Sequence, residues 1–93
     1  MTNWNADKIS SQNGFDLTVD RPATYCIQVV GYLDDNWSDR LGGLVITSSG
    51  QVGKRAVTTL SGPLIDQAAL FGVLKALYDM RLPLLSVECL EIN

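Results

Sequence analysis

The chain has 93 residues, of which 46% are hydrophobic and 18% charged, and its formal net charge is −3. A chain of this length is expected to form one domain, which buries roughly 60–65% of the surface of its unfolded chain. The charged fraction lies below the roughly 25% that is typical of globular proteins, and an apolar excess on a small domain often covers a partner. The composition therefore favours a homo-oligomer, with a tightly packed monomer as the alternative.

The basic residues are scattered along the chain, and only Lys54 and Arg55 are adjacent. Nucleic-acid binding needs clustered positive charge to neutralise phosphates, so nucleic acid is not expected as a partner. No apolar run approaches the ~20 residues that a membrane span requires, and the polar N-terminus lacks the pattern of a signal peptide. We therefore expect a cytoplasmic location without membrane association.

The chain divides into a polar arm over residues 1–20 and a single α+β domain over residues 21–93. Two interpretations of the arm are equally favoured: a disordered terminus, or a segment over residues 15–19 that pairs as an edge strand or reaches a neighbouring subunit. Residues 25–33 are rich in β-forming side chains and predict the first strand of the domain. Gly31 within it indicates a bulge or the close approach of another backbone.

Residues 34–40 predict one or two turns of helix, because the acidic residues at the start can accept hydrogen bonds from the free amides of the first turn. Gly42-Gly43 would end this helix, since glycine takes the positive φ that follows a helix C-terminus. A β-hairpin is expected next, with strands over residues 44–48 and 55–61 around a glycine-containing loop. Gly62-Pro63 is predicted to break the second strand.

The most regular pattern lies over residues 67–81, where apolar residues recur at intervals of three and four and predict an amphipathic helix. Asp66 is placed to cap the start of this helix, and Pro83 requires it to end before residue 82. Phe71 and Tyr78 lie two turns apart beside the apolar face. They either complete the core, which is the favoured interpretation, or contact another subunit.

Residues 84–92 predict a last, buried strand. The order of elements is strand, short helix, strand, strand, long helix and strand, which is the order of ferredoxin-like βαββαβ folds. Such a fold leaves one face of the sheet free of helices, and this face would be half apolar through Val30, Tyr32, Leu84 and Leu90. The first crossover is short, so a three-stranded β-meander followed by a helix and a strand is the alternative.

The residue types of the chain restrict its chemistry. Histidine is absent, which excludes Ser-His-Asp and Cys-His arrangements. Two separated cysteines, Cys26 and Cys89, cannot form a common zinc site without histidine, and they are interpreted as buried free thiols. No glycine motif matches a phosphate-binding loop. No catalytic residue, metal or cofactor is therefore predicted.

One constellation could form a binding site. Trp37 stands in a polar segment, where its ring either closes the end of the core, which is favoured, or forms the wall of a ligand pocket. In the second case Arg40 would hold an anion, with Asp66 and Gln67 as further candidates. The residues predicted for a ligand site or an interface are Trp37, Arg40, Asp66, Gln67, Phe71 and Tyr78.

Three segments carry a family resemblance, and they lie at residues 31–47, 58–80 and 82–88. They follow the patterns W-s-x-x-l-G-G-L, L-x-G-P-x-x-D-Q-A-A-L-x-G-v-L and l-P-L-L-S-V. The chain resembles a family of small uncharacterised bacterial proteins over about residues 31–88. Members often carry histidine where this chain has Phe71, so the resemblance implies a fold unit and no imidazole chemistry. A more distant similarity is to the regulatory ACT domain, although Ala68-Ala69 replace the glycine usual there.

These observations lead us to expect a small non-enzymatic oligomerisation or protein-interaction module that would suit a regulatory role. Its partner would be a second copy of the chain or another protein. Two alternatives stay open. One is a small-molecule sensor with its ligand at a subunit interface near Trp37 or Gly62-Pro63. The other is a cofactor-free ferredoxin-like enzyme with an enclosed pocket beside Trp37 and Asn36.

Overall fold

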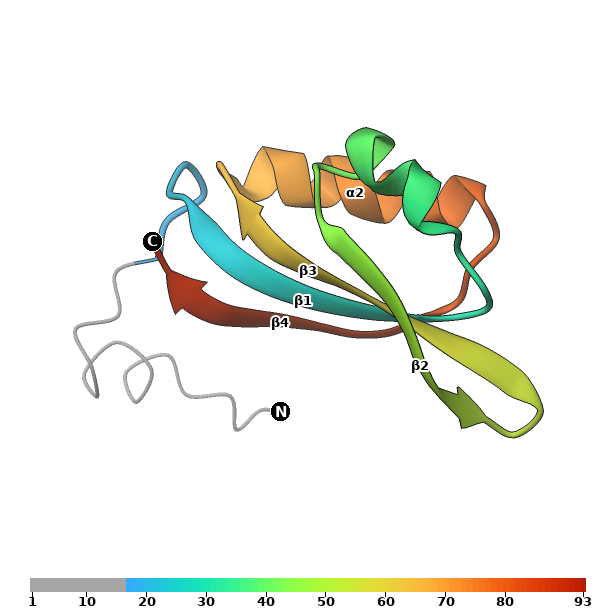
Figure 1. The fold of residues 1–93 in the computed structure, drawn as a ribbon. Helices are drawn as coiled ribbons and strands as arrows, with labels where there is room; N and C mark the ends of the chain where they lie inside the picture. Colours follow the sequence, from blue (N-terminus) through green and yellow to red (C-terminus); the bar gives the residue numbers. More distant parts are fainter. Residues whose placement is uncertain (1–16) are drawn as a thin grey trace, which may run out of the picture.

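The computed structural model describes residues 17–93, apart from the side chains of residues 49, 51 and 52. The predicted N-terminal arm therefore lies mostly outside the described residues. Four strands form one sheet, and the helices lie on one face of it (Figure 1). The elements are β1 (Ala23–Val30), the 3-10 helix η1 (Asp35–Arg40), β2 (Val45–Val52), β3 (Arg55–Leu64), α2 (Gln67–Asp79) and β4 (Leu84–Ile92). The expected α+β class is confirmed.

The sheet has the strand order β2-β3-β1-β4, and every neighbouring pair is antiparallel. The strand β1 lies between β3 and β4, so the alternative of a three-stranded meander is wrong. Because β3 is antiparallel to both of its neighbours, β1 and β2 run in the same direction on either side of it. The strands β2 and β4 form the two edges of the sheet.

The core lies between α2 and the sheet. Alternate residues of β1 point toward α2, as the period of two in a strand requires. From α2 itself Leu70, Val73 and Leu77 are buried. The buried apolar cluster consists of Ala23, Tyr25, Ile27, Val29, Leu33, Leu41, Leu44, Ile46, Leu60, Leu64, Leu70, Val73 and Leu77.

The helix α2 begins as the sequence predicts. A side-chain oxygen of Asp66 accepts a hydrogen bond from the amide of Ala69 at 2.8 Å, which satisfies one of the free donors of the first turn. The helix ends at Asp79, ahead of Pro83. Within the described part of the chain, no helix combines the length and the apolar character that crossing a membrane demands.

The short helix and its glycine stop are also confirmed. A carboxylate oxygen of Asp34 accepts a hydrogen bond from the amide of Asn36 at 2.9 Å and caps η1. Gly42 and Gly43 follow with φ angles of 70° and 73°. The amide of Gly43 donates to the carbonyl of Ser38 at 2.9 Å, so the chain turns back at the end of η1.

The expected strand break at Gly62-Pro63 is wrong. The strand β3 continues to Leu64, and Gly62 and Pro63 pair with Tyr25 and Thr24 of β1. Gly62 has a φ of 149°, and an added Cβ would lie 3.2 Å from a methyl group of Leu44. Glycine thus permits both the unusual backbone angle and the close contact, and pairing along β1 outweighs the local preference of Gly-Pro for a turn.

The expectation of a half-apolar sheet face opposite the helices is wrong for Tyr32 and Leu84. Val30 follows Val29 of the core and therefore faces away from α2 as expected, although it is buried opposite Val57, whereas Tyr32 lies beyond the end of β1. Leu84 pairs with Val29, whose side chain belongs to the core, so Leu84 lies on the helix side. The expectation assumed a regular alternation along β4, whereas two register shifts interrupt its pairing with β1 and leave Leu90 unpaired.

Polar side chains occupy much of the face that is turned away from α2. The side-chain amide of Gln28 in β1 donates a hydrogen bond to the hydroxyl of Thr59 in β3 at 3.4 Å. The hydroxyl of Ser86 in β4 donates to the side-chain oxygen of Gln28 at 3.2 Å. These bonds cross three strands, and a surface of this kind is poorly suited to bury a large apolar interface.

The two cysteines lie on neighbouring strands but on opposite faces of the sheet. Cys89 is opposite Tyr25, which points toward α2, whereas Cys26 is opposite Glu88 on the other face. Both are free, as expected, but each is only half-buried, so the interpretation as buried thiols is wrong in its second part. The pairing register therefore separates the two sulfur atoms by the thickness of the sheet.

Candidate functional site

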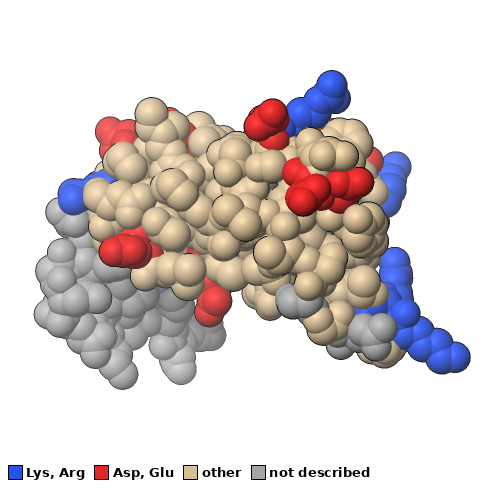
Figure 2. All heavy atoms as spheres, in the orientation of Figure 1, with Lys and Arg blue, Asp and Glu red and all other residues tan. Residues whose placement is uncertain are grey.

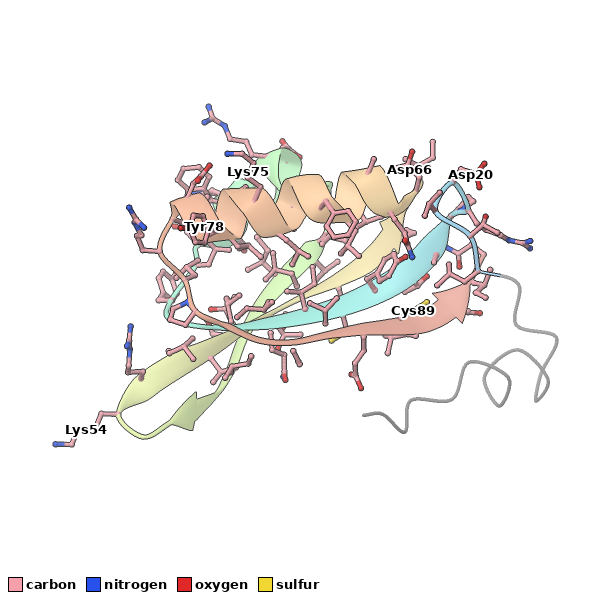
Figure 3. All side chains as sticks on the ribbon, turned by 180° about the vertical axis from the view of Figure 1, so that it is seen from behind. Asp20, Lys54, Asp66, Lys75, Tyr78 and Cys89 are labelled. Carbon is pink, nitrogen blue, oxygen red and sulfur yellow. The ribbon has the colours of Figure 1, made fainter. Side chains whose placement is uncertain are left out.

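The exposed apolar side chains gather on two neighbouring elements. Six of the eleven large apolar residues that are exposed in the described part of the chain belong to α2 and β4. We call these six residues the α2–β4 surface: Phe71, Tyr78, Leu84, Leu85, Val87 and Leu90. Figure 3 views the molecule from this side, with α2 above β4, Tyr78 near one end of the helix and Cys89 on the strand.

The strand β4 forms the free edge of this surface. The sequence predicts a buried strand here, but none of its nine residues is buried. Leu84, Leu85 and Leu90 are 53%, 45% and 58% exposed. A strand at an edge also presents unpaired backbone amides and carbonyls, and proteins normally protect such edges with charge, proline or a covering element. An apolar edge strand is therefore a place where another chain can add.

The aromatic residues of α2 do not complete the core, so the favoured interpretation of Phe71 and Tyr78 is wrong. Their side chains are 64% and 69% exposed. The spacing of seven residues places both on one flank of α2, and β4 on that side is the last strand of the sheet. The guanidinium of Arg81 lies 5.9 Å from the ring centre of Tyr78, which leaves most of the ring uncovered.

A narrow apolar groove runs between the end of α2 and the start of β4. Its volume is about 190 Å³. The lining residues are Leu74, Leu77, Tyr78, Leu82, Pro83 and Leu84. Small-molecule sites usually measure about 300–1,000 Å³ and add a few polar groups, so this groove fits a protein side chain better than a ligand.

Asp66 and Gln67 have structural roles at the start of α2. Asp66 caps the helix, and the backbone amide of Gln67 donates to the carbonyl of Val19 at 2.9 Å. The side-chain amide of Gln67 donates to the hydroxyl of Tyr25 at 3.4 Å. Neither residue lines a described pocket near Trp37, so the structure does not bring these two candidates to the other predicted ligand residues.

Trp37 and Arg40 do lie together. The guanidinium of Arg40 is 5.6 Å from the ring centre of Trp37, a geometry in which a cation is attracted to the face of the ring. With Asp34 and Asn36 these residues line an open hollow of about 380 Å³ on η1. Trp37 is 39% exposed, so the favoured interpretation of its ring as a plug of the core is wrong.

The hollow and the α2–β4 surface lie on different sides of the molecule. The hydroxyl of Ser38 in η1 donates to the carbonyl of Leu44 at 2.7 Å, which holds η1 beside the start of β2, the edge opposite β4. In Figure 2 acidic atoms gather over η1, and basic atoms mark the tip of the hairpin between β2 and β3. Among the residues that the structure describes, no group of three metal-binding side chains is present.

The apolar residues of β4 are absent from the candidates that the sequence suggests. Their segment, LLSVECL, is nearly continuous in apolar character, which is typical of a strand covered on both faces. Only the strand order shows that β4 is at the edge. The one signal in the sequence was the excess of apolar residues. This excess indicates that some apolar side chains are exposed but does not show on which elements they lie.

The comparisons with known proteins identify a family. A family model described as a domain of unknown function (DUF8691) matches residues 24–88. This range encloses the segments on which the family resemblance rests. The comparisons with curated proteins and with solved structures found no match.

Proposed function

The chain belongs to the DUF8691 family of domains of unknown function, and we propose that it is a small non-enzymatic oligomerisation module that acts through its α2–β4 surface. The observation that carries this proposal is an edge strand whose apolar side chains are half exposed. Contiguous exposed apolar patches on small soluble domains mark interaction sites, because leaving them in water is unfavourable.

The kinds of residue on this surface suit a specific interface. A standard interface buries about 800 Å² of each partner, with aromatic residues among the strongest contributors. That is about an eighth of the 6143 Å² surface of this chain. Two exposed aromatic rings and four exposed aliphatic side chains on adjacent elements supply apolar area of the required kind. The polar opposite face of the sheet, with its Ser, Thr and Gln side chains, offers no comparable surface.

We further propose that the domain is ferredoxin-like. The element order supports this assignment, with η1 in place of the first helix of a βαββαβ unit. The strand order supports it too, because each crossover connection skips one strand of the sheet. In such a domain both helices lie on one face, and β4 stays free at an edge for assembly.

The proposal predicts that Val87→Lys abolishes self-association. Val87 lies in the middle of β4 and is 37% exposed, so a lysine there fits the monomer but places an unpaired charge in the interface. Light scattering on the wild-type protein is expected to give twice the chain mass of 10.1 kDa, and the variant is expected to give the single mass. Circular dichroism checks that the variant is folded.

The matched control is Val45→Lys. Val45 is 63% exposed on β2, the other edge strand, and its replacement is expected to leave the dimer intact. A wild-type protein that keeps the single-chain mass across the accessible concentration range would contradict the proposal. So would equal loss of association in both variants, because β4 would then have no special role.

A small-molecule sensor is the second candidate function, and the hollow beside Trp37 favours it. Its volume of about 380 Å³ falls within the range of ligand sites, and it combines an aromatic wall with a guanidinium. The cofactor-free enzyme has less support, because this hollow is open to solvent whereas that alternative requires an enclosed pocket.

The sensor predicts stabilisation by small anions that bind Arg40. At 100 times its Kd a ligand stabilises the native state by about 2.7 kcal/mol, which raises the Tm of a domain of this size by several degrees. A thermal shift measurement with carboxylates and phosphates checks this, and Arg40→Gln is expected to remove the shift. If no anion raises the Tm of the wild-type protein, the hollow is not an anion site.

A further inference from the structure

We propose that the partner on the α2–β4 surface is a second copy of the chain, docked by antiparallel pairing of β4 with β4 and with Val87 on the two-fold axis. This inference rests on the proposed self-association and specifies its geometry. The two four-stranded sheets would join into one sheet of eight strands, with both α2 helices on the same face. A closed two-fold dimer of this kind satisfies both free edges at once.

The first support is the symmetry of the sequence in β4. From residue 84 to residue 90 the strand reads LLSVECL. Its polarity is apolar, apolar, polar, apolar, polar, apolar, apolar, and it reads the same in both directions with Val87 at the centre. A two-fold axis makes a strand pair with its own reverse, so only a segment with this symmetry matches apolar with apolar at every position.

The second support is the direction of the side chains. Val87 pairs with Ile27 and therefore faces α2, whereas Ser86 and Glu88 pair with Gln28 and Cys26 and face the other way. Residues directly opposite each other in a sheet share a face. If both α2 helices lie on the same face of the joined sheet, each β4 residue that faces α2 must lie opposite a β4 residue of the partner that also faces α2. The two-fold axis then lies between two copies of the same residue, one from each chain, and not between two different residues of the sequence.

The third support comes from charge and polarity at the centre of the strand. An axis at Glu88 would place two carboxylates directly opposite each other, and like charges in that position are destabilising. An axis at Ser86 would place Glu88 opposite the partner's Leu84. An axis at Val87 places Val87 against itself and Glu88 against the partner's Ser86. Of the three registers, only this one has neither a charge repulsion nor a charge against leucine.

The fourth support is the charge at the two ends of the strand. Arg81 precedes β4 and is exposed, and Glu91 lies near its other end and is also exposed. Antiparallel pairing brings the start of one strand beside the end of the other. In this register Glu91 lies opposite the partner's Pro83, two residues from the partner's Arg81, so each end of the interface carries one charge of each sign. Phe71 and Tyr78 of the two α2 helices would cover the paired strands from above.

Disulfide trapping tests the register. In the background Cys26→Ser, Cys89→Ala, the variant Val87→Cys is expected to form covalent dimers under mild oxidation. Directly opposite residues have Cα atoms about 4.5–5.5 Å apart, which suits a disulfide. Glu91→Cys is the control, because the two sulfur atoms would be about 26 Å apart along the strands. We expect most of the first variant and less than about a tenth of the second to cross-link, the contrast that a disulfide's narrow distance range requires.

A mixed sample provides a second and more specific measurement. Leu84→Cys and Leu90→Cys in the same background are expected to cross-link when mixed, because each lies opposite the other in this register. Neither variant is expected to cross-link when it is oxidised alone, since the same residue of the partner chain is about 20 Å away along the strands. With only Cys26 replaced, Leu85→Cys is expected to cross-link to the native Cys89 of the partner, which tests the register without changing Cys89.

The outcomes separate this inference from the proposed function. A dimer mass in light scattering without these cross-links would overturn the register while leaving self-association in place. A single-chain mass would overturn both. Cross-linking at Val87→Cys together with the mixed pair, and its absence at Glu91→Cys, would establish the antiparallel β4 pair.

Discussion

Leu60→Ala is expected to lower the free energy of unfolding by about 2–5 kcal/mol. Leu60 is fully buried in β3, where it pairs with Ile27 of β1 on one side and Ile46 of β2 on the other. Removing its side chain deletes apolar contacts to both strands and leaves a cavity that the rigid sheet can only partly close. A small domain has about 5–15 kcal/mol of stability in total, so the loss is a large fraction of it.

The control for Leu60→Ala is Ile65→Ala. Ile65 follows β3 and is 72% exposed, so its truncation is expected to change the free energy of unfolding by no more than about 0.5 kcal/mol. Urea unfolding followed by circular dichroism measures both, at a protein concentration low enough that dimerisation adds no stability. Similar losses in the two variants would show that Leu60 does not lie at the centre of the core.

Gly31→Ala is expected to be destabilising for two separate reasons. Gly31 has a φ of 121°, which side chains rarely adopt, and such strain costs on the order of 1–3 kcal/mol. An added Cβ would also lie 2.7 Å from a methyl group of Leu82, and overpacking of this kind costs about 1–3 kcal/mol, less whatever movement of Leu82 relieves. The carbonyl of Gly31 accepts a hydrogen bond from the hydroxyl of buried Thr58 at 2.6 Å, so a shift of this backbone would disturb the core.

Two other glycines separate these causes. Gly43 has a φ of 73°, but no described atom lies within 4 Å of the place of a Cβ, so Gly43→Ala is expected to show the backbone cost alone. Gly72 lies within α2 with similarly open space, and Gly72→Ala is expected to stabilise by up to about 1 kcal/mol. Urea unfolding of the three variants should therefore rank Gly31→Ala as the most harmful. A neutral Gly31→Ala would contradict the close approach at this residue.

Several local features could be predicted from the sequence because they depend on neighbouring residues alone. Asp66 caps α2 through an amide three residues further on, and Asp34 caps η1 in the same way over two residues. The glycine pair after η1 stops that helix through its own backbone angles. At Gly31 the expectation of a bulge or of a close backbone is wrong, because the group that approaches it is a methyl of the distant Leu82 side chain. In the caps and the glycine stop the cause and the effect lie within a few positions of each other.

The candidate surface depended on contacts between distant parts of the chain. Phe71 and Tyr78 lie beside the apolar face of α2 in any helical projection, but whether a strand covers them depends on the width of the sheet. Gly62 and Pro63 would break an isolated strand, yet pairing with β1 carries β3 through them. Trp37 stands beside Arg40 on the surface because η1 rests on β2 and not over the core.

The sequence by itself therefore determined the α+β class, the elements and their caps, and the presence of more apolar surface than one small core can hold. Only the tertiary structure decided where that surface lies. The same residues, LLSVECL, would be buried in a central strand and are exposed in an edge strand. The strand order β2-β3-β1-β4 places them at the edge. Hydrophobicity belongs to each residue, whereas exposure is set by the neighbours that the fold provides.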